Sequence, residues 1–386
     1  MAPTAISSEA AKPVLTGDKT YPEPIRSTGT LSKFKSEDIT PVIGTEFPEA
    51  NIVNDIINAS NADELLRDLA VTISERGVVF FRAQDNLTND IQKQFIHRLG
   101  QARLPPISTA IEQSKPNERA LQLTGKPAES TLHIHPVLND ERELGGSDPE
   151  ISTISSVQRK TLYRKPAETY RYKSAVWHSD ISFEPFPADY TSLRLVQLPT
   201  TGGDTLWASG YELYDRLSKP YQKFLEGLTA THVGSGFHDI AKAEGLTLYE
   251  KPRGNPGNIG LDLTAVHPAI RTNPVTGWKS LFPVGVFPRR INEVTLEESD
   301  ALLAWFHDLI YKNHDLQVRF KWRNPNDIAI WDNRSVFHTA TNDYEGLGER
   351  FGNRAVGIGE APYLDPNSRS RREGLAERAE ANASKN

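Results

Sequence analysis

The stretch Trp177-His178-Ser179-Asp180 places a histidine and an aspartate two positions apart in the sequence. On a β-strand, side chains at i and i+2 share one face of the sheet about 6–7 Å apart, whereas on a helix they diverge. Two side chains on one face can converge on a single metal ion. The pair by itself is a weak signal, because most polar dipeptides lie on a solvated surface.

A second stretch, Asp332-Asn333-Arg334-Ser335-Val336-Phe337-His338, supplies another histidine and is followed by Arg350 and Arg354. Two histidines and one carboxylate on one face of a metal leave coordination positions open, which is typical of non-haem Fe(II) oxygenases. An arginine beyond them can hold an acid, because its guanidinium stays charged and matches carboxylate geometry. A hydrogen-bonded core histidine is the structural alternative for His338. The predicted metal ligands, which are also the predicted catalytic residues, are His178, Asp180 and His338.

Longer stretches extend this pattern from about residue 40 to 362. They read WHSDISFE, LPTTGGDTLWASG, PNDIAIWDNRSVFHTATNDY, LHIHPV, HPAIRTNPVTGWKSLF and QVRFKWR. Together they resemble the taurine dioxygenase family of Fe(II)/2-oxoglutarate-dependent dioxygenases, in particular its sulfonate dioxygenase branch. The resemblance implies that the protein uses Fe(II), 2-oxoglutarate as co-substrate and O2.

The resemblance also implies two acid-binding positions. Arg350 occupies the family's position for the arginine that holds the far carboxylate of 2-oxoglutarate, and Thr205 matches the hydroxyl donor to the same group. An ordinary turn or strand threonine is the alternative for Thr205. Arg354 stands where the family binds the substrate sulfonate, and His135 matches the histidine that assists it. The alternative is that His135 chelates a second metal together with His133.

The rest of the implied substrate pocket is aromatic and departs from the family at two positions. Phe287 aligns with an aromatic wall of the pocket and Phe237 is assigned the same place, with ordinary core packing as the alternative for both. The tyrosine and asparagine that meet the taurine amine in the family correspond to Leu138 and Ser174 here. We therefore expect an acid-binding pocket that does not favour taurine itself.

Helices near both ends of the sequence and strands in the middle predict an α+β fold with a β core. The resemblance implies a double-stranded β-helix, or jelly-roll, core with flanking helices and a mouth in which ligands bind. His178 and Asp180 would then lie on one strand near that mouth, and His338 on a later strand.

Composition along the chain predicts its organisation. Residues 1–35 are poor in periodic apolar residues and are predicted to be a flexible N-terminal arm. A single dioxygenase domain is predicted over 36–365, and a charged C-terminal tail over 366–386. The stretch 139–173 is long and polar, so we expect an insertion that is either a lid over the site or passive.

Local patterns predict several elements inside the domain. Apolar spacing predicts a helix over 61–76 that ends at Gly77, and a second helix is expected between Thr88, as its cap, and Gly100. Thr295 begins a capping-box pattern ahead of a third helix that runs to about residue 312. Strands are predicted at 78–81, 190–198, 328–331 and 351–358.

Composition excludes several classes of protein. The 386 residues have a formal net charge of −6 and no basic stripe, which argues against a nucleic-acid partner. Cysteine is absent, so disulfides, zinc–thiolate sites and thiol nucleophiles are excluded. No signal-peptide pattern or long apolar run is visible, so we expect a cytoplasmic protein without a membrane partner. A small anionic substrate is the expected partner, and homo-oligomer formation is left open.

The leading hypothesis is a dioxygenase that hydroxylates a small organosulfonate and releases succinate and CO2. Sulfite and an aldehyde would follow if the carbon next to the sulfonate were attacked. A close alternative keeps the enzyme class but assigns a small amino or carboxylic acid in specialised metabolism, since one arginine can bind either acid. A catalytically silent barrel that acts as a binding protein is a remote alternative, and a zinc hydrolase is more remote because the sequence has no His-Glu-x-x-His motif.

Overall fold

The computed structural model describes residues 21–102, 132–137, 148–157 and 176–384. Its framework consists of two main sheets, both largely antiparallel. The larger sheet has seven strands in the order β1 (Glu37–Asp38), β2 (Thr45–Phe47), β3 (Val78–Phe81), β13 (Asp327–Asp332), β5 (Ala188–Gln197), β15 (Phe351–Ile358) and β4 (Ser152–Ser155). The smaller sheet has the order β12 (Gln317–Phe320), β6 (Thr205–Ser209) and β14 (Val336–Ala340).

The side chains of β13 show how the larger sheet buries both of its faces. Ala329 and Trp331 join the apolar cluster that also contains residues of β6 and β12, so they face the smaller sheet. Ile328 and Ile330 join a different cluster, which lies against the helices. Successive side chains on a strand point to opposite faces, which explains this division. In the residues described, the strand is buried along its whole length.

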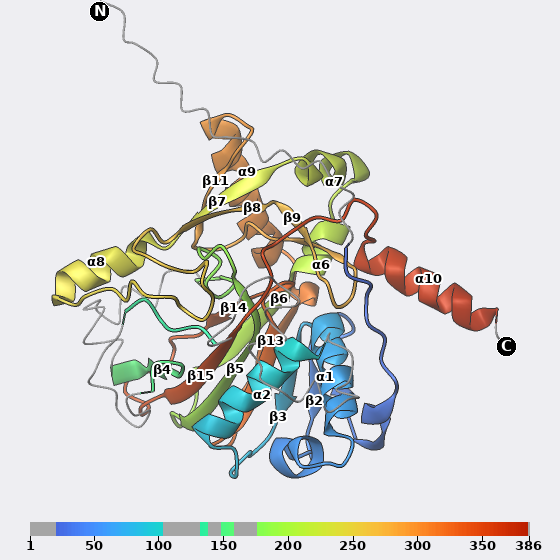
Figure 1. Cartoon of the computed structure of the whole chain (residues 1–386), viewed down its shortest axis with the longest axis vertical. Helices are drawn as coiled ribbons and strands as arrows, with labels where there is room; N and C mark the ends of the chain where they lie inside the picture. The colour runs from blue at the N-terminus through green and yellow to red at the C-terminus, as the bar shows by residue number, and fades with distance from the viewer. Residues whose placement is uncertain (1–20, 103–131, 138–147, 158–175, 385–386) are drawn as a thin grey trace, which may run out of the picture.

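Helices cover the outer face of the larger sheet. The helices α1 (Ala62–Arg76) and α2 (Asn89–Gln101) lie beside β3, β13 and β5 (Figure 1). Gly77 ends α1 with a φ of 76°, as the sequence predicts. The Thr88 side chain accepts a hydrogen bond from the backbone N–H of Ile91, so the predicted cap of α2 is confirmed. This helix continues one residue past the predicted end at Gly100.

Most of the remaining strands and helices form a second lobe above the sheets (Figure 1). Its strands are β11 (Pro288–Ile291), β7 (Thr229–Val233) and β8 (Thr264–Pro268) in one sheet, with β10 (Lys279–Leu281) and β9 (Ile270–Thr272) in another. Its helices are α6 (Gly210–Asp215), α7 (Lys219–Glu226), α8 (Ser235–Glu244) and α9 (Leu296–Tyr311). The predicted capping box of Thr295 and Glu298 is present at the start of α9. Short helical turns occupy Thr30–Lys33, Ile52–Ile57 and His314–Leu316.

The N-terminal residues differ in part from the predicted flexible arm. Residues 21–35 belong to the predicted flexible arm, yet Ile25 is buried and its N–H donates to the Val275 carbonyl at 3.0 Å. Thr28 and Thr30 bind the Asp68 carboxylate, so this part of the arm is packed and the prediction is wrong there. Residues 1–20 lie outside the described residues.

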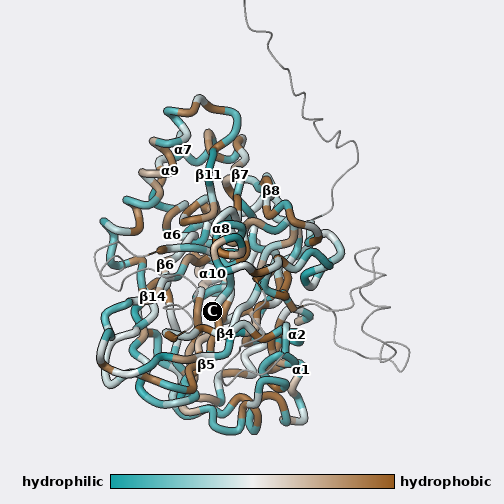
Figure 2. Tube along the Cα trace, turned by 90° about the vertical axis from the view of Figure 1, so that its left-hand side faces the viewer, coloured by the Kyte–Doolittle hydropathy of each residue, from teal (hydrophilic) through white to brown (hydrophobic). Residues whose placement is uncertain are grey.

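The predicted insertion and tail contain regular structure. The strand β4, inside the interval 139–173, pairs with β15 and so extends the larger sheet. The helix α10 (Arg371–Ala383) begins at a capping box in the predicted tail and projects from the body (Figure 1). Hydrophilic residues follow the outer turns of the molecule, whereas hydrophobic stretches gather along the inner strands (Figure 2). No helix in the described ranges combines the length and the apolar character that crossing a membrane requires.

Candidate metal and co-substrate site

His178 reaches the candidate site through a single backbone bridge to His338. The N–H of His178 donates to the His338 carbonyl at 3.1 Å, and the N–H of His338 donates to the His178 carbonyl at 2.8 Å. His338 lies on β14, as predicted. His178 and Asp180 do not share a regular strand, so that expectation is wrong. After the one bridge the chain turns, and Ile181 has a φ of 47°.

The turn nevertheless brings the three predicted ligands together. The Nε2 atoms of His178 and His338 lie 3.8 Å and 3.9 Å from Asp180 Oδ1. Ligand atoms of all three side chains lie within 4.8 Å of one another. An imidazole nitrogen and a carboxylate oxygen on one metal, each with a bond of about 2.1 Å, can be at most about 4.2 Å apart. Both nitrogen–oxygen separations are within this span, and the donor types suit a non-haem iron.

The protonation states of these side chains also suit a metal. Burial alone would raise the pKa of Asp180, but the Arg354 guanidinium and the two histidines outweigh it and hold the pKa at about 2. Burial lowers the pKa of His178 and brings that of His338 to about 3. A carboxylate and two neutral imidazoles are the forms that bind a metal. Asp180 Oδ2 is buried and has no hydrogen-bond partner among the described residues, so it is available to a cation.

Asn333 fixes the backbone of the turn at 178–181, which carries two of the candidate metal ligands and is called the metal-binding turn below. The sequence did not indicate this role, although Asn333 lies in a quoted motif. Its Oδ1 accepts hydrogen bonds from the Asp180 N–H and from Trp331 Nε1, both at 3.0 Å. Its Nδ2 donates to Thr191 Oγ1 at 2.8 Å. The Asn333 carbonyl also accepts from the Ser179 hydroxyl at 2.8 Å. Contacts that distant in sequence leave no periodic signal.

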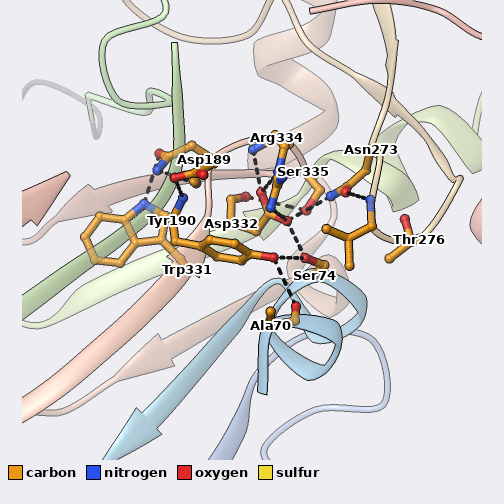
Figure 3. A network of polar contacts seen from close by, with 12 residues as sticks. Ala70, Ser74, Asp189, Tyr190, Asn273, Thr276, Trp331, Asp332, Arg334 and Ser335 are labelled. Carbon is orange, nitrogen blue, oxygen red and sulfur yellow. Dashed lines mark hydrogen bonds and ion pairs between the residues drawn. The ribbon is translucent and has the colours of Figure 1, made fainter. Parts of the chain in front are cut away.

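The turn that contains Asn333 is itself held by a buried polar network (Figure 3). The Asp332 carboxylate accepts hydrogen bonds from Arg334 Nε at 2.7 Å, from the Ser74 hydroxyl at 2.7 Å and from Asn273 Nδ2 at 2.9 Å. Burial opposes its charge, but Arg334 keeps the pKa of Asp332 below its ordinary value. The Tyr190 hydroxyl lies 2.9 Å from the Ser74 hydroxyl. The network thus links α1 and β5 to the end of β13.

Arg350 and Thr205, predicted to bind the co-substrate, lie side by side in the interior. Arg350 Nη2 donates to Thr205 Oγ1 at 3.3 Å, and Arg350 Nε donates to the Gly203 carbonyl at 2.9 Å. Arg350 is only 3% exposed. A Cβ on Gly203 would lie 2.9 Å from Arg350 Cδ, so the close approach needs glycine. Trp322 Nε1 donates to the Thr205 hydroxyl at 3.1 Å.

Arg354 lies against the candidate metal ligands. It belongs to β15, and its Nη1 donates to Asp180 Oδ1 at 2.7 Å. Its side chain is 13% exposed and therefore mostly buried. A charged guanidinium of this kind can bind an acid directly beside the metal position.

A row of aromatic rings leads from His135 to the candidate metal ligands. The centroid of the His135 ring lies 5.1 Å from that of Phe237, and Phe237 lies 6.3 Å from Phe287. Phe287 in turn lies 6.0 Å from the His178 ring. Phe183, which the sequence analysis did not select, contacts both phenylalanines at 5.2 Å and 5.1 Å. The remaining predicted positions, Leu138 and Ser174, lie outside the described residues.

Comparisons with known proteins point in the same direction. Residues 35–356 match the model of a family described as "Taurine catabolism dioxygenase TauD, TfdA family". The alpha-ketoglutarate-dependent dioxygenase btcD of Neocamarosporium betae is 48% identical, with 91% of this chain and 98% of the relative covered. An alpha-ketoglutarate-dependent sulfonate dioxygenase of Saccharomyces cerevisiae is 29% identical, over 87% of this chain and 69% of the relative.

A solved structure confirms the predicted fold. The crystal structure of a taurine dioxygenase from Burkholderia xenovorans matches with a TM-score of 0.59 and 23% identity, covering 87% of this chain and 94% of that one. The α+β jelly-roll expectation is therefore confirmed.

Proposed function

The chain belongs to the TauD/TfdA family and is an Fe(II)/2-oxoglutarate-dependent dioxygenase, and from that premise we propose that it oxidises a small organosulfonate. The observation that supports this most directly is the position of Arg354, whose guanidinium binds the same Asp180 carboxylate that faces the two histidines. An acid bound by Arg354 would place its neighbouring carbon beside the metal. When bound, Fe(II) supplies the oxidising chemistry with 2-oxoglutarate and O2.

The protein's own residues have binding and orienting roles in this proposal. His178, Asp180 and His338 hold the iron and leave its remaining positions to the co-substrate and O2. Thr205 and Arg350 bind the far carboxylate of 2-oxoglutarate. Because Arg350 is buried and permanently charged, an anion of matching geometry is its expected partner.

The substrate pocket is assigned to Arg354 and to the aromatic row that ends at His178. Arg354 and His135 bind the acid group, while Phe237 and Phe287 border the carbon chain. Leu138 and Ser174 replace the family residues that meet an amine, so the proposed substrate has a less polar tail than taurine. Hydroxylation next to the sulfonate would release sulfite and an aldehyde, with succinate and CO2 formed from 2-oxoglutarate.

A second candidate function keeps the enzyme class and assigns a small amino or carboxylic acid as substrate, in specialised metabolism. The relative with 48% identity is named a dioxygenase without mention of sulfonate, whereas the named sulfonate dioxygenase is 29% identical. An arginine binds a carboxylate as readily as a sulfonate.

A substrate panel tests the two candidates. Purified Fe(II)-loaded protein would receive 2-oxoglutarate with butanesulfonate, hexanoate or taurine, and succinate, sulfite and product mass would be measured. We expect butanesulfonate to stimulate succinate release above taurine and to yield sulfite, because an apolar pocket gives an ammonium no partner. Stimulation by hexanoate alone, without sulfite from any sulfonate, would favour the second candidate. A clear preference for taurine would contradict the proposal that the substrate lacks an amine.

A further inference from the structure

Glu184, Arg253 and His133 form a buried cluster beside the metal-binding turn that the proposed function leaves without a role. Side-chain exposure is 1% for Glu184 and His133 and 0% for Arg253. Arg253 donates to both carboxylate oxygens of Glu184, through Nε to Oε1 and through Nη2 to Oε2 at 3.0 Å. His133 Nε2 lies 3.3 Å from Oε1. The opposite charges of the glutamate and the arginine cancel. We call these three residues the Glu184 clasp.

Arg253 also organises the loop that contains it. Its Nη1 donates to the carbonyls of Tyr249 and Gly260, at 3.0 Å and 2.8 Å. The contacts named here occupy four of the five N–H groups of a guanidinium. The 249–260 segment therefore closes around a charge that Glu184 neutralises.

This loop joins two other segments of the protein. On one side, the Tyr249 N–H donates to the Pro136 carbonyl at 2.8 Å. On the other side, Asn258 exchanges two hydrogen bonds with the backbone of Phe186, at 3.0 Å and 2.8 Å. The first contact holds the 132–137 segment, and the second holds the chain that continues from the metal-binding turn.

The 132–137 segment contains His135, the residue proposed to assist in binding the substrate acid. Its attachments lie on either side of that histidine. The His133 N–H donates to the Val356 carbonyl at 2.8 Å, and the His133 ring faces Glu184. Pro136 follows directly and is held by the 249–260 loop. The position of His135 relative to the metal-binding turn thus depends on the clasp.

We propose that Glu184 is a positioning residue for the substrate. Through Arg253 and His133 it fixes the distance between His135 and the metal-binding turn, and so the place where the acid group of the substrate is bound. The proposal rests on the proposed function, because the role of His135 belongs to it. Glu184 itself touches neither the substrate nor the metal in this proposal.

The test compares Glu184→Gln with the control Glu46→Gln. Glu46 also accepts two hydrogen bonds from an arginine, Arg82, and is 13% exposed, but it lies on β2. With butanesulfonate and hexanoate as probes, we expect Glu184→Gln to raise the KM for the acid that is oxidised about tenfold or more, with a smaller change in kcat. The KM for 2-oxoglutarate should stay within about twofold of the wild-type value, because Arg350 is held by Gly203 and Thr205, which do not belong to the clasp. Glu46→Gln should change none of these constants.

Variants of His133 keep the test decisive if Glu184→Gln does not fold. His133→Gln retains a side-chain N–H for Glu184 and should behave like the wild type, whereas His133→Leu should raise the same KM. Three results would each overturn the proposal. The KM for the acid could stay at its wild-type value, the Glu46→Gln control could raise that KM as much as Glu184→Gln does, or the KM for 2-oxoglutarate could rise together with the KM for the acid.

A further measurement separates failure of the clasp from failure of the proposed function. If neither acid stimulates the wild-type protein, the substrate proposal fails, and amide hydrogen exchange then decides about the clasp. Exchange should rise in 132–137 and 249–260 of Glu184→Gln, but not in 351–358. Exchange equal to that of the wild type would overturn the clasp as well.

Discussion

Asp180 is the residue at which the charges of the candidate site meet. It accepts a hydrogen bond from Arg354, faces the Nε2 atoms of His178 and His338, and has its backbone N–H fixed by Asn333. A carboxylate can stay ionised in such a buried position because positive and hydrogen-bonding groups surround it. The same side chain therefore connects the proposed metal position with the proposed acid-binding position.

Changing Asp180→Ala should abolish 2-oxoglutarate turnover and weaken binding of Fe(II) or Mn(II) by more than about 100-fold. Loss of an outer partner of a metal ligand already costs about 10–100-fold, and loss of the ligand itself should cost more. Anaerobic calorimetry measures the affinity, and circular dichroism checks the fold. Asp315→Ala, which removes a carboxylate that is 69% exposed, is the control. Wild-type metal affinity in Asp180→Ala would contradict the ligand assignment.

Arg350 and Arg354 give a reciprocal pair of variants. Arg350→Ala should raise the KM for 2-oxoglutarate by orders of magnitude, since a buried carboxylate that loses its charged partner typically loses about 2–5 kcal/mol of binding. Arg354→Ala should instead raise the KM for the oxidised acid. Steady-state kinetics with each reactant varied in turn distinguishes the two. The opposite pattern would mean that the two arginines have exchanged roles.

At the level of elements, short connections decide where the site residues lie. The helix α1 ends at Gly77, and β3 begins at the next residue. A Cβ on Gly77 would lie 2.6 Å from Val336 Cγ1, at the start of β14, the strand that contains His338. The end of a helix is thus packed directly against the strand of a proposed ligand.

Gly77→Ala should therefore destabilise the protein more than Gly245→Ala. Gly245, with φ 64° and ψ 27°, is in the left-handed helical conformation, which costs an alanine about 1–2 kcal/mol. Gly77, with φ 76° and ψ −46°, lies outside that region, so its backbone is less accessible still to an alanine. Only Gly77 adds a steric clash, because nothing lies within 4 Å of a Cβ at Gly245. Urea unfolding of both variants measures the difference. Equal losses of unfolding free energy would contradict this prediction, because both the backbone conformation and the contact with Val336 would then be accommodated without added cost.

For the molecule as a whole, buried histidines outside the candidate site link stability to pH. His267 on β8 is buried, and burial with the charge of Arg271 lowers its pKa to about 4. His232 on β7, beside it at 5.2 Å between ring centroids, also has a lowered pKa because of burial. Both imidazoles are therefore neutral in the folded protein and take up protons on unfolding in mild acid.

The sign of the pH effect follows from these pKa values. Below the ordinary pKa of 6.5, His267 is protonated in the unfolded chain, whereas in the folded chain it stays neutral down to about pH 4. Stability is thus present above pH 6.5 and falls as the pH drops towards 4, by about 2 kcal/mol between pH 7.5 and 5 for one such histidine. Denaturant unfolding at the two pH values should show this loss, and His267→Gln should reduce it. An identical loss in the variant would contradict the assignment to His267.

Much of the fold follows from interactions between neighbours in the sequence. The caps at Thr88 and Thr295 and the stop at Gly77 are confirmed because each depends on groups within one helical turn. The prediction of a strand at 351–358 matches β15, whose residues are mostly buried. The histidines and aspartate of the candidate site were also found from sequence, because they lie in long motifs.

Other features were decided only by the tertiary structure. His178 and Asp180 meet His338 through one bridge and a turn, not along a strand, because Asn333 holds the Asp180 N–H across 153 positions of sequence. Residues 21–35 are polar enough to be read as an arm, yet Asp68 on α1 binds them.

The Glu184 clasp shows the physical reason for this division. Arg253 lies 69 positions from Glu184, and the sequence around neither residue indicates that the other is its partner. A charge is buried only when the folded chain delivers an opposite charge and hydrogen-bonding groups to the same place. The sequence by itself therefore determined the residue types of the candidate site and the local helices and strands, because these depend on nearby residues. The tertiary structure alone decided which distant charges neutralise one another, because burial depends on the whole fold.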